Sequence, residues 1–182
     1  HLVPMLRRHE LDCITSRATS AVAQDDLSHR VLYRQRPRLI AHSRLAQRLA
    51  RRKPDWAGLA EMDWVLPAAN TPTRQLIVEH FIRAGLRSPS PVLEAYSTDV
   101  IEGMLSANDA LMSVVPEDIA REICQRGKLG MVPWDFGWEL PPINLIRRRR
   151  EQALAAEDRF SEILLELCAP ASGGQPVPGD IQ

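Results

Sequence analysis

Hydrophobic positions along the chain follow two kinds of pattern, short continuous runs and stretches with helical spacing. The continuous runs predict buried strands, which we place at 12–15, 30–34, 37–41, 64–66, 92–96, 110–115, 129–134 and 143–146. Apolar residues three or four positions apart predict helices at 1–9, 43–53, 72–84, 116–126 and 153–167, with another after a Ser97-Thr98-Asp99 cap. Strands that alternate with helices in this way predict an α/β fold with largely parallel sheets.

The order of these elements predicts two lobes. Residues 42–141 hold a complete set of alternating strands and helices, whereas the flanking parts, 1–41 and 142–168, must share a second sheet. The chain would then cross between the lobes twice, which predicts a cleft between them. The end of the chain, 169–182, is rich in Pro, Gly and Ser and is predicted to be a disordered tail.

The helical spacing also predicts which side chains are buried. The helix at 72–84 is expected to bury Leu76, Ile77, Phe81 and Ala84. The helix after Ser97 is expected to bury Val100, Ile101, Met104 and Leu105, and the last helix to pack Leu154, Phe160, Ile163, Leu164 and Leu167. Glu79 and His80 are interpreted as surface residues rather than as an acid–base pair.

Composition supports a folded, electrically neutral chain. Hydrophobic residues make up 45% of the 182 positions, and 23 basic residues balance 23 acidic ones. A neutral chain argues against broad nucleic-acid binding. The charge is nevertheless uneven, because 27–54 holds nine basic residues and no acidic one, and 147–150 is a second basic run. We interpret both as solvated faces in preference to polyanion-binding patches.

Three cysteines, Cys13, Cys124 and Cys168, form no pair motif. An odd number without C-x-x-C spacing indicates reduced thiols in a cytoplasmic protein. No stretch approaches the length of a membrane-spanning helix. The chain opens on His1 rather than Met, and we expect it to be a fragment that lacks its true N-terminus.

The segment 64–74 (WVLPAANTPTR) is the leading candidate for a binding site. It combines a buried strand, a polar turn and the start of a helix, which is where open α/β sheets bind ligands. Thr71 or Asn70 can cap the helix, and Pro72 suits its first position. The free backbone donors of such a turn suit a carboxylate, a phosphate or a hydroxyl group.

Several segments together resemble the LysR-type transcriptional regulators. Segment 6–12 (LRRHELD) is similar to the family's LRxGELD motif, and 64–74 is similar to the strand, loop and helix of its second regulatory subdomain. Residues 115–120 and 140–147 resemble two further elements in the family's order. The form WVLP followed by TPxR is similar to the regulators of sugar-binding-protein and aromatic-acid genes. The resemblance covers 1 to about 167.

This resemblance implies a sensor of two Rossmann-like subdomains, of the type 2 periplasmic-binding-protein class, that binds a small effector between them. The first subdomain would be incomplete, with remnants at 1–41 and 142–168, and the second would occupy 42–141. A winged helix-turn-helix DNA-binding domain would lie upstream, absent from this chain, and DNA would be bound only through it. The resemblance also implies a homodimer or homotetramer in the full-length protein, and no membrane association.

Nine positions are candidates for effector contacts, and six of them match family positions. Thr71, Pro72, Thr73 and Arg74 match the effector loop, and Arg74 is the one cation among them, able to pair with a carboxylate. The alternative is that Thr71 only caps its helix and Arg74 points into solvent. Ser97 and Thr98 match a second helix cap facing the same cleft. The remaining candidates are Asn70 and, at a strand end on the opposite wall, Thr15 and Ser16.

His9 departs from the family pattern, since it replaces the glycine of the first motif. Glycine there would suit a backbone with positive φ, which a histidine adopts less readily. We therefore expect this turn to be strained if φ is positive.

Two other functions stay open from the sequence. A solute-binding protein of a transporter has the same architecture and would carry a signal peptide upstream. An enzyme is disfavoured, because the chain shows no nucleophile–base set, no Gly-rich phosphate loop and no ligand cluster at metal spacing, and we expect no cofactor. The loop 134–138 (WDFGW) is interpreted as an apolar seam rather than a sugar-binding platform.

Overall fold

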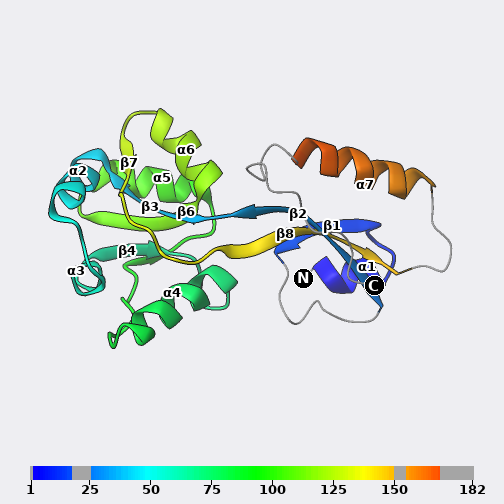
Figure 1. The fold of residues 1–182 in the computed structure, drawn as a ribbon, viewed down its shortest axis with the longest axis horizontal. Coiled ribbons are helices and arrows are strands. Elements are labelled where there is room, and N and C mark those ends of the chain that lie inside the picture. The colour runs from blue at the N-terminus through cyan, green and yellow to red at the C-terminus, as the bar shows by residue number, and fades with distance from the viewer. Residues whose placement is uncertain (1, 18–25, 150–154, 169–182) are drawn as a thin grey trace. The chain divides into compact units, whose positions relative to one another are not determined.

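The computed structural model describes residues 2–17, 26–149 and 155–168. The chain forms two compact units, one made of His1–Gln35 with Pro141–Gln182 and the other of Arg36–Leu140. The predicted tail at 169–182 and the predicted packing of Leu154 lie outside the described residues. The units are described in turn (Figure 1).

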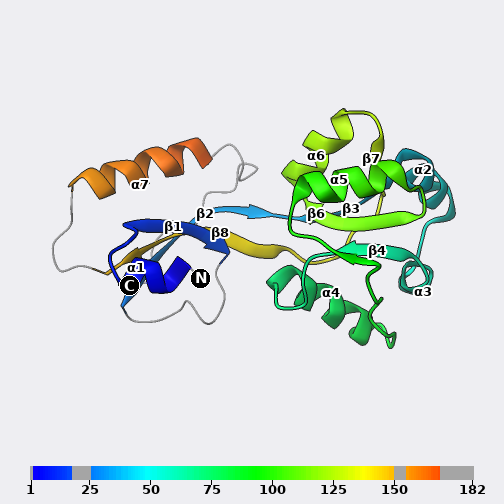
Figure 2. The ribbon, with the colours of Figure 1, turned by 180° about the vertical axis from the view of Figure 1, so that it is seen from behind.

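The first unit is a three-stranded sheet in the order β1-β8-β2. It contains β1 (Cys13–Arg17), β2 (Leu27–Gln35), β8 (Leu140–Arg148), the short helix α1 (Leu2–Arg7) and α7 (Ala155–Cys168). β1 and β8 are antiparallel. The two helices lie on opposite sides of this sheet in both ribbon views (Figures 1 and 2). Leu6, Ile14, Leu27 and Ile146 form its buried core.

The second unit is a five-stranded sheet in the order β5-β4-β6-β3-β7. Its strands are β3 (Pro37–His42), β4 (Asp63–Leu66), β5 (Leu93–Glu94), β6 (Leu111–Pro116) and β7 (Leu129–Met131). β5, β4 and β6 are parallel, but β3 is antiparallel to both of its neighbours. The expectation of a largely parallel sheet therefore holds for three strands only.

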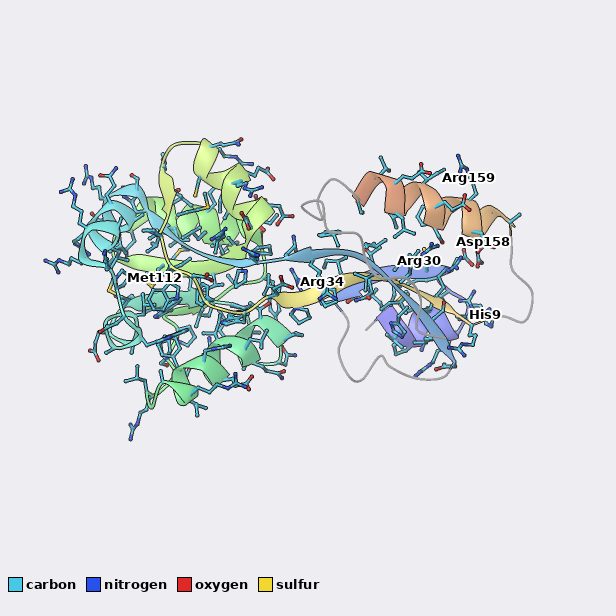
Figure 3. The ribbon with its side chains drawn as sticks, viewed as in Figure 1. His9, Arg30, Arg34, Met112, Asp158 and Arg159 are labelled. Carbon is cyan, nitrogen blue, oxygen red and sulfur yellow. The ribbon has the colours of Figure 1, made fainter. Side chains whose placement is uncertain are left out.

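Helices cover both faces of the second sheet. They are α2 (Ser43–Arg52), α3 (Trp56–Ala60), α4 (Pro72–Arg83), α5 (Thr98–Ala107) and α6 (Glu117–Gln125). One core cluster joins α2, α3 and α4 to one face of the sheet, around Trp64 and Phe81. A second cluster joins α5 and α6 to the other face. Met112, labelled in Figure 3, is fully buried in the central strand β6.

Several predicted core positions are not buried. Val100 and Met104 of α5 are 46% and 37% exposed, because Ile101 and Leu105 alone turn toward the sheet. Ala84 lies beyond the end of α4 and is exposed, and Leu76 is half-buried. On α7 the predicted core residues Phe160, Ile163 and Leu167 are exposed, and the buried residue is Ser161. An ion pair of 3.1 Å between Asp158 (Figure 3) and Arg147 joins α7 to β8.

α2 approaches β7 closely at Gly130. A Cβ added there would lie 3.1 Å from the Cβ of Ala46 and 3.6 Å from the Cα of Ser43. The opposite end of α2 terminates at Lys53, which has a left-handed φ of 49° just before Pro54. α2 is therefore held against the sheet over its whole length by its buried residues Leu45, Ala46 and Leu49.

Candidate functional site

The parallel strands of the second unit end at one edge of its sheet. Pairing of Val65 with Leu93 and of Trp64 with Met112 aligns β4 with its neighbours β5 and β6. The connections that leave this edge lead into α4, α5 and α6, so three helix N-termini meet there. Helix N-termini carry partial positive charge and free backbone N–H groups, which favour an anion.

Thr71 caps α4 as the sequence predicts. Its backbone is extended, and its Oγ1 accepts a hydrogen bond from the backbone N–H of Arg74 at 3.3 Å. The same hydroxyl donates to the carbonyl of Ala68 at 2.8 Å. Pro72 occupies the start of the helix. Because the hydroxyl proton is used within the turn, Thr71 can only accept a hydrogen bond from a ligand.

Arg74 is buried, contrary to the alternative that it points into solvent. Only 8% of the residue is exposed. Its Nη2 lies 3.5 Å from the carbonyl oxygen of Pro89, a long hydrogen bond, and its Nη1 has no partner within the described part of the chain. A buried guanidinium with an unpaired nitrogen is costly unless another group satisfies it.

Ser97 occupies the cap position of α5 but does not cap it. Its backbone is extended, yet its side chain makes no capping hydrogen bond, so the predicted capping role is wrong. The residue is exposed, and Thr98 begins the helix. The Ser97 hydroxyl and the first-turn N–H groups of α5 therefore do not form a capping hydrogen bond of the kind that joins Thr71 to the Arg74 N–H on α4.

Tyr96 was not predicted as a site residue. It follows β5, is 73% exposed, and its hydroxyl lies 3.5 Å from Oδ1 of Asn70. This long hydrogen bond joins the turn after β4 to the turn after β5. The signal in the sequence is an aromatic residue directly before the Ser97 cap.

Thr15 and Ser16 belong to the first unit and lie within β1, which continues to Arg17. The expectation that they end a strand is wrong. They pair with Leu145 and Asn144 of β8, and Ser16 is half-buried while Thr15 is exposed. The structure thus gathers Asn70 to Arg74 with Ser97 and Thr98 at one edge of the second unit, and Thr15 with Ser16 in the first.

At the N-terminus of α6, the carboxylate of Glu117 is bound by two arginines. Glu117 pairs with Arg38 at 3.1 Å and also with Arg121. Burial opposes ionisation of Glu117, but the hydrogen bond and charge of Arg38, with those of Arg121, outweigh it and lower its pKa. Of the three helix starts, only that of α4 has a side-chain capping hydrogen bond, and α5 is the one whose cap position holds a hydroxyl that makes no such bond.

The aromatic loop after β7 packs inward. Trp134 and Trp138 lie against the core cluster around Trp64 and Phe81, and their buried Nε1 atoms have no hydrogen-bond partner among the residues that the structure describes. Asp135 accepts a hydrogen bond from the Gly137 N–H at 2.9 Å and so shapes the loop. This geometry supports the apolar seam over the sugar platform.

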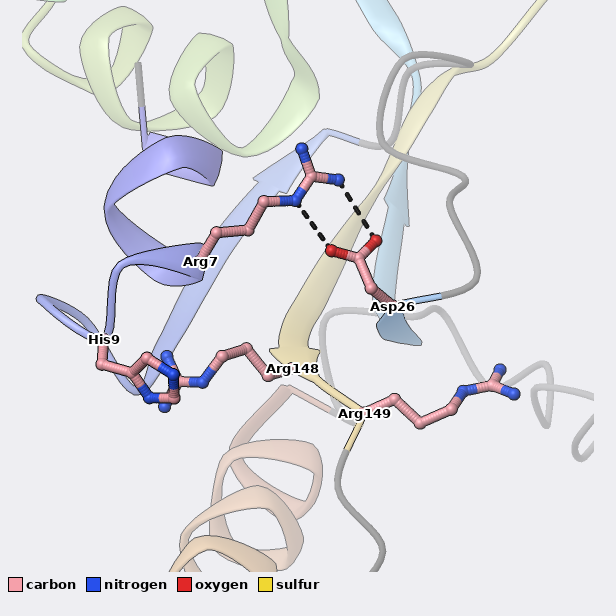
Figure 4. A pocket seen from close by; sticks show the side chains of 5 residues that line it. All are labelled: Arg7, His9, Asp26, Arg148 and Arg149. Carbon is pink, nitrogen blue, oxygen red and sulfur yellow. Dashed lines mark hydrogen bonds and ion pairs between the residues drawn. The ribbon is translucent and has the colours of Figure 1, made fainter.

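The first unit contains a hollow of about 630 Å³ that the sequence did not predict (Figure 4). Arg7, His9, Asp26, Arg148 and Arg149 line it. Arg7 forms two hydrogen bonds with Asp26, at 2.8 and 3.1 Å. Arg148 donates to the carbonyls of Leu6 and Leu11 at the end of α1. These contacts use Arg7 and Arg148 to hold the unit together.

Within the described residues, no group of three or more His, Cys, Asp or Glu side chains is placed to hold a metal ion. Nor does any helix among them have the length and apolar character needed to cross a membrane.

Comparisons with known proteins agree on one family. A family model described as the LysR substrate binding domain matches residues 1–169. The HTH-type transcriptional regulator GalR of Pseudomonas putida is 37% identical over 91 residues, which are 50% of this chain and 23% of that regulator. This chain therefore aligns with less than a quarter of the curated relative's length.

Solved structures share the fold at low sequence identity. A putative transcriptional regulator from Vibrio parahaemolyticus superposes with a TM-score of 0.77 at 18% identity, covering 93% of this chain and 75% of that one. The effector binding domain of QuiR in complex with shikimate superposes with a TM-score of 0.71 at 15% identity, covering 94% and 78%.

Proposed function

The chain belongs to the LysR substrate-binding domain family, and we propose that it senses a small acidic metabolite, aromatic or sugar-derived, for a transcription regulator. Membership of this family confirms the predicted resemblance and the type 2 periplasmic-binding fold. In the proposed mechanism, effector binding shifts the arrangement of lobes or subunits and so controls DNA binding by a separate N-terminal domain.

The observation that carries the proposed ligand class is the state of Arg74. Its guanidinium is buried at the first turn of α4 and has an unpaired Nη1. A carboxylate that reached this nitrogen would replace an uncompensated buried charge with a charge-assisted hydrogen bond. This favours an acid over a neutral ligand.

The first turn of α5 supplies the complementary donors in this proposal. The Ser97 hydroxyl makes no capping bond, and the N–H groups behind it have no partner within the helix. Asn70, Thr71, Pro72, Thr73 and Thr98 complete the proposed wall at this edge of the second unit. Thr71 accepts a hydrogen bond from a ligand hydroxyl, because its own proton is used.

Thr15 and Ser16 are proposed as contacts from the first unit, which we interpret as the remnant of the first regulatory subdomain. We further propose a cytoplasmic protein that forms a homodimer or homotetramer at full length.

Family membership favours a regulator over the solute-binding protein of a transporter and over an enzyme, since substrate-binding domains of this family belong to transcription regulators. The upstream coding sequence discriminates the first two. A winged helix there supports the regulator, whereas a signal peptide would support the transporter protein.

The direct test is a thermal-shift screen of the full-length protein against aromatic and sugar acids, with shikimate among the probes. A ligand at a hundred times its Kd stabilises the folded state by about 2.7 kcal/mol, which raises Tm by several degrees in a protein of this size. We expect the shift from an active acid to shrink in Ser97→Ala and Thr71→Val. Ser106→Ala, at the other end of α5, is the matched control and should keep the full shift. Equal shifts in all four proteins would refute the site.

A further inference from the structure

Four arginines lie side by side on the exposed face of α2. Arg44, Arg48, Arg51 and Arg52 are all exposed, and with Gln47 they line a shallow hollow of about 360 Å³. Their spacing of four, three and one residues keeps them on one side of the helix, over roughly 12 Å of its length. The helix contains no acidic residue.

These guanidinium groups have no ion-pair partner among the described residues. Three other exposed arginines of the second unit do have carboxylate partners: Arg83 pairs with Glu79, Arg121 with Glu117, and Arg126 with Glu102 and Glu122. The segment 27–54 is free of Asp and Glu, and the next carboxylate in the sequence, Asp55, caps α3 by accepting a hydrogen bond from the Gly58 N–H.

The arrangement works against the stability of the helix. Arg44 with Arg48, and Arg48 with Arg52, are like charges four residues apart, which repel each other. Arg44 also lies in the first turn, at the positive end of the helix dipole. A bound anion would relieve both of these unfavourable interactions.

The face is also held rigidly. The opposite side of α2 buries Leu45, Ala46 and Leu49 against the sheet, and Gly130 allows the close contact with Ala46. Exposed lysines extend the basic surface at both ends. Lys53 terminates the helix, and the carbonyl of Lys128 accepts a hydrogen bond from the Ser43 N–H at 3.0 Å.

We propose that this arginine face of α2 binds the phosphate backbone of double-stranded nucleic acid without reading its sequence. Guanidinium groups match phosphate oxygens bidentately, and a duplex presents phosphates at regular intervals along the length of such a face. Because the chain is neutral overall, it attracts a distant duplex only weakly. The four arginines of α2 can still bind phosphates at contact distance, where screening by salt is smaller. This contact would add to any sequence-specific DNA binding by another domain. It therefore revises the expectation that DNA is bound only through the winged helix-turn-helix domain. It does not depend on the effector site.

The test measures binding of the 182-residue chain to a fluorescent 20-base-pair duplex of arbitrary sequence by anisotropy. With four phosphate contacts, affinity should fall on the order of a hundredfold between about 50 and about 200 mM salt, a log–log slope of about −3.6. Replacing Arg44, Arg48, Arg51 and Arg52 together by Gln should weaken binding at the lower salt by more than about tenfold. Replacing the same four by Lys should keep most of the salt slope, because the charge remains.

The matched control replaces Arg83, Arg87, Arg121 and Arg159 by Gln, which removes the same charge from exposed positions elsewhere. This control should bind the duplex within about twofold of the parent chain, since its phosphate contacts are intact. Equal loss in both Gln variants, or no binding by the parent chain at low salt, would overturn the proposal. So would equally tight, α2-dependent binding of poly-glutamate, which would identify an acidic protein as the partner. Circular dichroism of each variant verifies that α2 remains folded.

Discussion

His80 of α4 stacks on Trp138 from the loop after β7, with ring centroids 5.3 Å apart and planes inclined by 14°. The His80 ring is also nearly parallel to Trp56 of α3, at 6.1 Å. The interpretation of His80 as a surface residue is therefore wrong, whereas Glu79 is exposed and paired with Arg83. His80 joins three segments of the second unit through its ring.

The stacking of His80 predicts a pH dependence of stability. Burial lowers the pKa of His80, the charge of Arg83 lowers it further, and Glu79 only partly opposes them. The unfolded chain then binds this proton more readily than the folded one. The contribution of His80 to stability is complete above its ordinary pKa of 6.5 and is lost as pH falls through the lowered value.

Urea denaturation of the chain between about pH 5 and pH 8 measures this effect. His80→Phe should flatten the fall in stability on the acid side, because it keeps a stacked ring and removes the titration. His29→Gln, at an exposed position of β2, is the control and should leave the profile unchanged. An identical acid fall in His80→Phe would contradict the assignment.

His9 predicts a stabilising substitution. Its φ is 62°, and the turn that ends α1 is closed by hydrogen bonds from His9 N–H to Leu6 and from Glu10 N–H to Met5. A left-handed backbone costs a residue with a Cβ about 1–2 kcal/mol. Glycine avoids this strain in the folded chain, but its greater conformational freedom in the unfolded chain offsets part of the gain. His9→Gly should raise the free energy of unfolding of the chain by up to about 1 kcal/mol in urea titrations.

The neighbouring change Arg8→Gly provides the contrast for His9. Arg8 lacks a positive φ, so glycine there adds entropy to the unfolded state, removes the exposed ion pair of Arg8 with Glu10 and should destabilise the chain. If His9→Gly destabilised the chain, the imidazole of His9 would contribute more to stability than the strain of its positive φ costs.

The cap positions of α4 and α5 predict unequal effects of similar substitutions. Thr71→Ala removes the hydrogen bond to the Arg74 N–H and should destabilise the chain by about 1 kcal/mol. Ser97→Ala removes no capping bond and should change the free energy of unfolding by less than about 0.5 kcal/mol. Urea titrations that found equal losses at both positions would show that Ser97 caps α5 in solution.

Gly130 predicts a steric conflict that a second substitution relieves. Gly130→Ala places a Cβ 3.1 Å from the Cβ of Ala46, so the chain should lose about 1–3 kcal/mol of stability. Adding Ala46→Gly removes the opposing atom, and the double variant should be more stable than the two separate losses predict. Gly103→Ala, whose added Cβ meets nothing within 4 Å on α5, is the control and should stabilise by about 1 kcal/mol.

Local features were predictable from the sequence because they depend on atoms a few residues apart. The Thr71 cap, Pro72 at the helix start and the end of α2 before Pro54 all arise in this way. The glycine expected at His9 similarly identified a positive φ, which the structure contains. The family resemblance extended these local matches to the fold, since their order along the chain is shared.

Burial and pairing depended on the tertiary structure. The helical spacing of apolar residues predicted that Val100 and Phe160 are buried. Both are exposed, because α5 and α7 each contact the sheet of their own unit along a narrower face than the apolar pattern suggests. Arg74 was expected either to face an effector or to point into solvent, and its burial beside Pro89 excludes the solvent alternative. A periodic pattern identifies the apolar side of a helix, whereas the width of the surface that covers it comes from segments distant in the chain. For this reason the sequence determined the order and ends of the elements, and the three-dimensional packing determined which side chains remain free to bind.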